Sequence, residues 1–353
     1  MNSDAFVACL CTLAAGLLSA WGTRRFSHSS SSLFILDYPN ERSLHTRPIP
    51  RTGGVAISTA VLLSGGLWVL YTNEQWPKSA ALGVTAAFVA VTSFLDDRRH
   101  IAPHYRLLAH FAAAAALLFS GFAVDRSWLP APLADVPTGV LQLVTVLYLV
   151  WMLELYNFMD GMDGFAGGMA VAGFGSLAVL SVTGGADLIA GLSLVIAAAA
   201  FGFLLLNFPP ARIFMGDAGS ATLGLLAGAL SVWGAQSGAF PIWAAILVFS
   251  PFIVDATVTL VRRGWRREKI WTPHKTHYYQ RLVQLGWSHR RVLLWEYMLM
   301  AATSASALWS VRQTEAAQLA MLMTWAVIYT LLGTTVHLLE TTHHAHLRTS
   351  VDR

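Results

Sequence analysis

The chain has 353 residues, of which 55% are hydrophobic and only 12% are charged. Soluble domains carry roughly 25% charged residues, so this composition excludes an ordinary soluble protein. The net charge of +4 is small, and because its basic residues collect in a few loops it indicates membrane orientation and anionic ligands, not a nucleic-acid partner.

Apolar stretches of about 20 residues, the length that crosses a ~30 Å hydrocarbon core, recur along the whole chain. They predict an all-α polytopic membrane protein that forms one integral-membrane domain, 1-353. The Gly- and Ala-rich spans 164-183 and 220-235 are expected to permit close helix contact. About eleven transmembrane helices are expected, near residues 5-23, 54-72, 79-95, 107-124, 138-156, 164-183, 188-206, 220-235, 240-260, 292-310 and 317-339.

The Lys and Arg residues set the expected orientation, because short cytoplasmic loops collect them. If the N-terminus lies outside, the loops on the opposite side hold 20 of the 23 basic residues. That side is therefore expected to face the cytoplasm. No large soluble domain fits between the spans, so the active site is expected in the cytoplasmic loops 24-53, 96-106, 157-163, 207-219 and 261-291.

The first of these loops combines turn-forming Pro and Gly with basic residues, which predicts a rigid and cationic segment. Arg42 and His45 are its candidate phosphate contacts. A local capping role for His45 is the alternative.

Three short acidic motifs lie at the cytoplasmic ends of the expected spans: Asp96-Asp97, Asp160 with Asp163, and Asp217. Two unit charges about 4 Å apart repel by ~4 kcal/mol at an effective dielectric near 20, so converging carboxylates call for a bound cation. Oxygen ligands without Cys suit Mg²⁺, or Mn²⁺, rather than zinc. Five separate solvated acids are the alternative, which the neighbouring Gly and Asn residues disfavour.

Two of these motifs have a local geometry that favours ligand binding. Asn157, Asp160 and Asp163 are three residues apart and share one face if the helix continues through them. The segment from Phe214 to Asp217 precedes a new helix, whose N-terminal amides can bind an anion.

The last cytoplasmic loop contains His274, Lys275, His277 and Arg281. One helical turn there gathers several donors for phosphate or uracil oxygens. The alternative is simple anchoring at the membrane surface. Asp255 lies in the preceding span, where an isolated acid costs ~2.5–3.5 kcal/mol, and it is expected to support the site.

Taken together and in order, these motifs resemble those of the polyprenyl-phosphate N-acetylhexosamine-1-phosphate transferases (glycosyltransferase family 4). That family also contains the phospho-N-acetylmuramoyl-pentapeptide transferase of peptidoglycan synthesis. The motifs are Pro39-Asn40-x-Arg42-x-x-His45, Asp96-Asp97, Asn157-x-x-Asp160-Gly-x-Asp163-Gly, Met215-Gly-Asp217-x-Gly-Ser220, Pro251 with Asp255, and the His274 loop.

The resemblance implies ten or eleven helices in a bacterial inner (cytoplasmic) membrane, with the N-terminus in the periplasm. It implies Mg²⁺ dependence, a UDP-N-acetyl amino sugar as donor, undecaprenyl phosphate as acceptor, and UMP as the leaving product. The lipid bilayer is then a partner, a homodimer is compatible with the family, and no nucleic acid is expected.

The resemblance also implies residue roles. Asp217, Asn157 and Asp160 would hold the metal, and Asp96 and Asp97 would position the acceptor or a metal, with proton removal as the second choice. A covalent aspartyl-phosphate route stays open. The remaining expected site residues are Asp163 for catalysis and, for substrate binding, Arg42, His45, Phe214, Asp255, His274, Lys275, His277 and Arg281.

His274-Lys-Thr-His277 departs from the three consecutive histidines of the peptidoglycan branch. It is more similar to the branch that initiates O-antigen or other surface polysaccharides, several members of which use 6-deoxy amino sugars. The peptidoglycan transferase is kept as the alternative. From other classes, a secondary transporter would place its acids near the midplane in repeated halves, and a CDP-alcohol transferase would carry them in one compact segment.

Overall fold

The protein is almost entirely helical in a computed structural model that describes residues 3–31, 33–39, 46–99, 101–128, 135–269 and 274–351. Two short antiparallel strands pair Leu36 with Pro50 and Asp37 with Ile49. The elements are α1 (Ser3–Phe26), β1 (Leu36–Asp37), β2 (Ile49–Pro50), α2 (Gly53–Thr72), α3 (Trp76–Arg99), α4 (Pro103–Phe119), η1 (Arg126–Trp128), α5 (Thr138–Phe158), α6 (Phe165–Thr183), α7 (Asp187–Asn207), α8 (Asp217–Gln236), α9 (Ile242–Val248), α10 (Ser250–Trp265), α11 (Tyr278–Gln284), α12 (His289–Ser310) and α13 (Glu315–Val351).

Helix α8 forms the centre of the bundle, since every residue from Ala218 to Ala235 is buried. It contacts α2, α3, α5, α6, α7 and α9. Its small residues allow this, because a Cβ on Gly224 would lie 2.4 Å from the Met152 carbonyl oxygen of α5. The close contact expected of the Gly- and Ala-rich spans is therefore confirmed.

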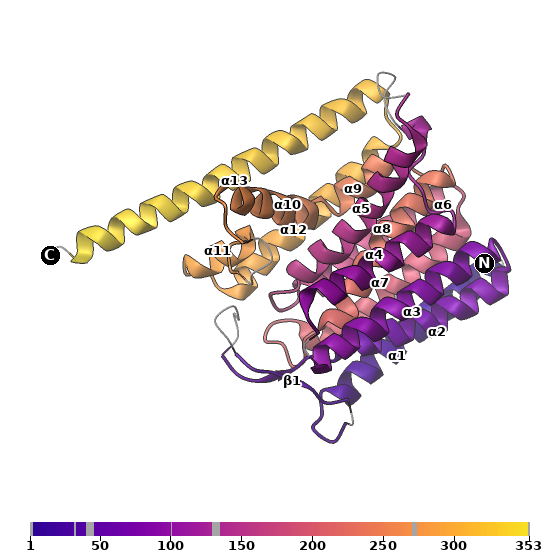
Figure 1. Ribbon diagram of the computed structural model, residues 1–353, viewed down its shortest axis with the longest axis horizontal. Helices are drawn as coiled ribbons and strands as arrows, with labels where there is room; N and C mark the ends of the chain where they lie inside the picture. Colours follow the sequence, from indigo (N-terminus) through magenta and orange to yellow (C-terminus); the bar gives the residue numbers. More distant parts are fainter. Residues whose placement is uncertain are drawn as a thin grey trace.

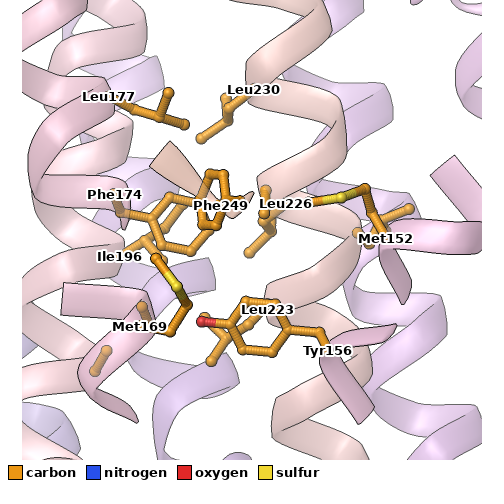
Figure 2. Packing of buried hydrophobic residues seen from close by; sticks show 14 of the residues in the cluster. Met152, Tyr156, Met169, Phe174, Leu177, Ile196, Leu223, Leu226, Leu230 and Phe249 are labelled. Atoms are coloured by element: carbon orange, nitrogen blue, oxygen red, sulfur yellow. The ribbon is translucent and has the colours of Figure 1, made fainter. Parts of the chain in front are cut away.

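The core on either side of α8 is filled by larger side chains. Leu223 lies beside Tyr156 of α5, and Leu230 lies opposite Leu177 of α6, as Figure 2 shows. All four side chains are buried. This packing holds α5 and α8, whose ends carry Asn157 and Asp217, in fixed positions relative to α6, which begins just after Asp163.

Eight of the described helices are long and apolar enough to cross a membrane, and the α9–α10 pair makes a ninth if it is counted as one span. These results confirm an all-α polytopic membrane protein. Helices α4 and α12 coincide with two further expected spans, but they are not among the eight, and α4 has only 17 residues. The expected count of eleven is thus not established.

The expectation of one continuous helix over 240-260 is wrong. The chain bends by 78° between α9 and α10. Pro251, in the first turn of α10, lacks the N–H that would continue α9, and its ring is incompatible with the preceding turn. The ring of Phe249 packs edge-on against Phe174 and fixes the break within the core. As a result α10 takes a direction different from that of α9 (Figure 1), and its Asp255 accepts a hydrogen bond from the amide of Tyr278 at the start of α11.

Helix α13 continues well past the expected span 317-339, over 37 residues. Figure 1 shows it leaving the helix bundle and passing α11 on its way to the C-terminus. At 1.5 Å per residue it is about 55 Å long, more than a ~30 Å hydrocarbon core requires. Its extension provides Glu340, whose carboxylate pairs with Arg281 of α11.

The membrane orientation remains a prediction that single cysteines can test. In a background without Cys9 and Cys11, we expect Thr314→Cys to react with an impermeant maleimide in intact cells. Gln284→Cys, also exposed, should react only after permeabilisation. The reverse pattern would contradict the distribution of Lys and Arg as the determinant of orientation.

Candidate active site

The three acidic motifs come together at one end of the bundle. Asp96 and Asp97 lie in the last turn of α3, Asn157 in the last turn of α5, and Asp217 is the first residue of α8. The two α3 carboxylates are buried, whereas Asp217 is 26% exposed. The interpretation of these acids as separate solvated loop residues is therefore wrong.

Arg106, near the start of α4, joins two of the motifs. Its Nη1 lies 3.0 Å from Asp96 Oδ2 and 3.0 Å from Asp217 Oδ2. The second oxygen of Asp96 accepts a hydrogen bond from the Ile101 amide at 2.7 Å. A single guanidinium thus bridges carboxylates that are more than a hundred residues apart in the chain. The sequence alone shows Arg106 only as one of the basic residues of the loop 96-106.

Asp97 is held by the first loop and by α8. Arg51 donates to the Asp97 carbonyl oxygen, and its Nη1 is 3.8 Å from Asp97 Oδ1. The amide of Ala218 donates to Asp97 Oδ2 at 3.3 Å. Gly216 has φ 73°, and a Cβ there would lie 2.9 Å from this carboxylate, so the turn before α8 requires glycine.

The segment between α5 and α6 is a loop, so the condition under which Asn157, Asp160 and Asp163 would share one helix face is not met. Helix α5 ends at Phe158, and α6 begins at Phe165 after Gly164 with φ 75°. Asp163 accepts a hydrogen bond from the Ala211 amide at 2.9 Å and joins this loop to the one before α8. Asp163 thereby supports the loop geometry.

Asp160 remains available to a ligand, whereas Asn157 already has hydrogen-bond partners within the site. Ser220 donates to Asn157 Oδ1 at 3.1 Å, and Asn157 also hydrogen-bonds Asp217. Among the described residues, no donor contacts the Asp160 carboxylate. Burial raises its pKa well above the usual value, and the charges of Asp217 and Asp97 raise it further.

These features fit a hard divalent cation, because the acids outnumber the arginines and Asp160 lacks a donor. Within the described part of the chain, no three His, Cys, Asp or Glu side chains stand together as a complete ligand set. Mg²⁺ typically takes one or two carboxylates and fills its other positions with water and substrate phosphates. Asp217, Asn157 and Asp160 are the residues that could hold such an ion.

The last loop approaches the acids from the other side. Tyr279, in α11, lies against Gly161, where a Cβ would be 2.1 Å from its hydroxyl oxygen. His277, just before α11, is 2% exposed, and its Nδ1 is 3.2 Å from Asp255 Oδ1. The backbone amides of Tyr278 and Tyr279 donate to the same carboxylate at 3.0 and 3.4 Å. Asp255 therefore holds the loop in place.

The expected clustering of donors on one helical turn is only partly correct. Helix α11 begins at Tyr278, so His274 and Lys275 precede it. Arg281 is buried and donates through Nε and Nη2 to both carboxylate oxygens of Glu340 in α13. The side chain of Lys275 is half-buried and has no ion-pair partner in the described segments.

His274 is uncharged at neutral pH. Burial lowers its pKa to about 4, with His277 and Arg263 acting in the same direction and Asp255 opposing them. Its Nδ1 lies 3.0 Å from the hydroxyl oxygen of Thr276. Of these two neighbouring residues, Lys275 is therefore the candidate for the charge-assisted contact with a substrate phosphate that the sequence predicts.

A pH dependence of stability follows from His274. An unfolded histidine has a pKa of about 6.5, so between about pH 6.5 and 4 the unfolded state binds a proton that the folded state does not. His274 therefore leaves the free energy of unfolding unchanged above about pH 6.5 and lowers it as the pH falls from about 6.5 to 4. We expect His274→Gln to flatten this fall in melting temperature relative to wild type. Parallel curves for the two proteins would contradict it.

The remaining expected site residues are Arg42, His45 and Phe214. Arg42 and His45 lie outside the described residues. Phe214 contributes its backbone, since its amide donates to the Pro50 carbonyl at 2.7 Å and its carbonyl accepts from Gly53 at 3.0 Å. It thereby fixes the hairpin β1–β2 to the loop before α8.

Comparison with known proteins shows the family to which the chain belongs. The model of glycosyl transferase family 4 matches residues 79–235, which contain all three acidic motifs. A probable undecaprenyl-phosphate N-acetylglucosaminyl 1-phosphate transferase of Bacillus subtilis is 33% identical over 77% of this chain and 76% of its own length. The chain belongs to the polyprenyl-phosphate N-acetylhexosamine-1-phosphate transferases. It is therefore an enzyme, a glycosyl-1-phosphate transferase, and the family resemblance drawn from the motifs is confirmed.

Two further relatives are a decaprenyl-phosphate transferase and a pentapeptide transferase. The decaprenyl-phosphate N-acetylglucosaminephosphotransferase of Mycolicibacterium smegmatis is 32% identical over 86% of the chain and 82% of its own length. A phospho-N-acetylmuramoyl-pentapeptide-transferase of Prochlorococcus marinus is 25% identical over 74% of each chain. The transporter and CDP-alcohol alternatives are thereby set aside.

Proposed function

We propose that this enzyme transfers N-acetylhexosamine 1-phosphate from a UDP-sugar to undecaprenyl phosphate, releasing UMP. The observation that carries the proposal is that Arg106 bridges Asp96 and Asp217, while Asn157 hydrogen-bonds Asp217 and the charge of Asp217 acts on Asp160. Several acids with few cations suit a site that receives two phosphorylated substrates together with a metal ion.

The sugar is proposed to be N-acetylglucosamine, because the relatives at 31–33% identity carry that sugar in their names. A 6-deoxy amino sugar has no support in those names. The peptidoglycan alternative is less favoured, since its representatives match at 25–28% identity. Initiation of O-antigen or another surface polysaccharide, at the cytoplasmic face of an inner membrane, is the corresponding pathway proposal.

Different residues of the site would receive the acceptor phosphate and hold the metal ion. The acceptor is a phosphomonoester with a second pKa near 6, so it is largely dianionic at neutral pH and needs no strong general base. Arg106 and Arg51 place positive charge beside Asp96 and Asp97, where an incoming phosphate would otherwise be repelled. Asp217, Asn157 and Asp160 would hold Mg²⁺, which when bound neutralises the donor diphosphate. Lys275 and His277 approach from the last loop.

The test is a panel of UDP-sugars incubated with purified enzyme, undecaprenyl phosphate and Mg²⁺, with the lipids analysed by mass spectrometry. We expect a lipid diphosphate N-acetylhexosamine, formed best from UDP-N-acetylglucosamine and abolished by a chelator. Restoration by Mg²⁺ or Mn²⁺ but not by Ca²⁺ alone is the expected metal pattern. Exclusive use of a UDP-muramoyl-pentapeptide would contradict the proposal, as would full activity in chelator.

A further inference from the structure

A buried hydrogen bond between a histidine and a glutamate lies directly behind the site. His110 of α4 is 1% exposed, and its Nδ1 is 2.7 Å from Oε1 of Glu154 in α5. Its other ring nitrogen, Nε2, is buried without a partner among the described residues. Charged and polar groups inside helical membrane proteins are costly and usually serve function. A pair that leaves one buried nitrogen unsatisfied is also a poor way to gain stability.

The positions of the pair connect it to the reaction. His110 follows Arg106 by four residues on α4, and Glu154 precedes Asn157 by three on α5. Residues three or four apart share a helix face, so each member lies one turn behind a residue of the site. The Glu154 carboxylate is also close enough to attract the Arg106 guanidinium electrostatically.

We propose that His110 and Glu154 are positioning residues that hold Arg106 across Asp96 and Asp217, an inference that rests on the function proposed above. The charge of Glu154 draws the guanidinium toward the bundle interior. The hydrogen bond from His110 fixes the Glu154 rotamer and stops it from pairing directly with Arg106. Without His110, Glu154 competes with the two aspartates, and Arg106 leaves the position in which it bridges them.

The competition explains why a histidine suits this place. Arg106 is 28% exposed on its side chain and interacts with three acids, so its orientation depends on their balance. A hydrogen-bond donor that engages one oxygen of Glu154 weakens the hold of that acid on Arg106 without removing its carboxylate. Partners of this kind, which orient a group in direct contact with the chemistry, typically change activity about 10- to 100-fold when lost.

A double-mutant cycle tests the link. We compare His110→Leu, His110→Gln and the control Thr145→Val, each alone and together with Arg106→Lys, which replaces the guanidinium fork by a compact ammonium that cannot reproduce it. Thr145 is a buried polar residue of α5 that donates to the Leu141 carbonyl, remote from the site. We expect His110→Leu to lower kcat/KM about tenfold when Arg106 is intact but less than about twofold in the Arg106→Lys background.

His110→Gln, which can still donate to Glu154, should recover most of the loss, and Thr145→Val should act equally in both backgrounds. Equal losses for His110→Leu in both backgrounds would overturn the inference, because independent structural defects add. If the wild-type enzyme makes no lipid product from any UDP-sugar, the proposed function fails instead. The same cycle measured as melting temperatures then decides: non-additive shifts support the link between His110 and Arg106, and additive shifts overturn it.

Discussion

Asp217→Asn is expected to lower turnover at least about 100-fold while leaving the protein folded. The change removes a charge that both Arg106 and a metal ion would use, yet it preserves the size of the side chain. Metal stabilisation of transition-state charge is worth several kcal/mol, and each ~1.4 kcal/mol is a factor of ten in rate. The check is turnover as a function of Mg²⁺ concentration together with the melting temperature.

Asp187→Asn is the matched control for this prediction. Asp187 is also the first residue of a long apolar helix, α7, but it is exposed and lies outside the site. Each acid gains about 0.3–1 kcal/mol from the helix dipole, so both variants lose this contribution to stability. Only Asp217→Asn should lose activity. Equal activity of the two variants would remove the role assigned to Asp217.

Asp255→Asn is expected to cause the second large loss, through the loop that contains His277. The buried carboxylate accepts from His277, from the amides of Tyr278 and Tyr279, and from the Thr259 hydroxyl at 3.0 Å. An amide offers only one acceptor oxygen and turns a donor toward the remaining partners. Hydrogen bonds to charged groups contribute about 1.5–3 kcal/mol each, so a loss of about 100-fold in kcat/KM is expected.

The control for Asp255 is Thr259→Val. It removes one donor to the carboxylate but none that comes from the loop. We expect nearly normal kinetics for Thr259→Val, and for Asp255→Asn both slow turnover and faster proteolytic cleavage between residues 274 and 288. A slow Asp255→Asn enzyme with unchanged protease resistance would instead indicate that Asp255 contacts substrate directly.

The part of the site that follows from the order of the membrane spans was predictable, because successive loops lie on opposite sides of the membrane. Once the spans were assigned, Asp97, Asn157 and Asp217 had to lie on one side of the membrane, and the structure brings them into contact. The role of Arg106 was not predicted, because an excess of basic residues in the cytoplasmic loop 96-106 already accounted for its charge. Its role depends on the direction of α4, which the sequence does not specify.

Two other features depended on tertiary packing. Hydropathy is continuous across Phe249, so only Pro251 signalled the bend between α9 and α10, and a proline alone does not distinguish a kink from a 78° break. Arg281 and Glu340 are 59 residues apart, and Glu340 lies just beyond the expected last span. Local patterns do not pair residues at that separation, so the contact between α13 and the last loop was not foreseen.

The central claim is that the bond broken lies within the donor diphosphate, so that phosphate travels with the sugar. The most direct measurement is the nucleotide released from UDP-N-acetylglucosamine, quantified beside the lipid product. We predict UMP in a one-to-one ratio with a lipid diphosphate sugar, and transfer of a β-phosphate label from donor to lipid. Release of UDP, with the label left on the nucleotide, would contradict the account.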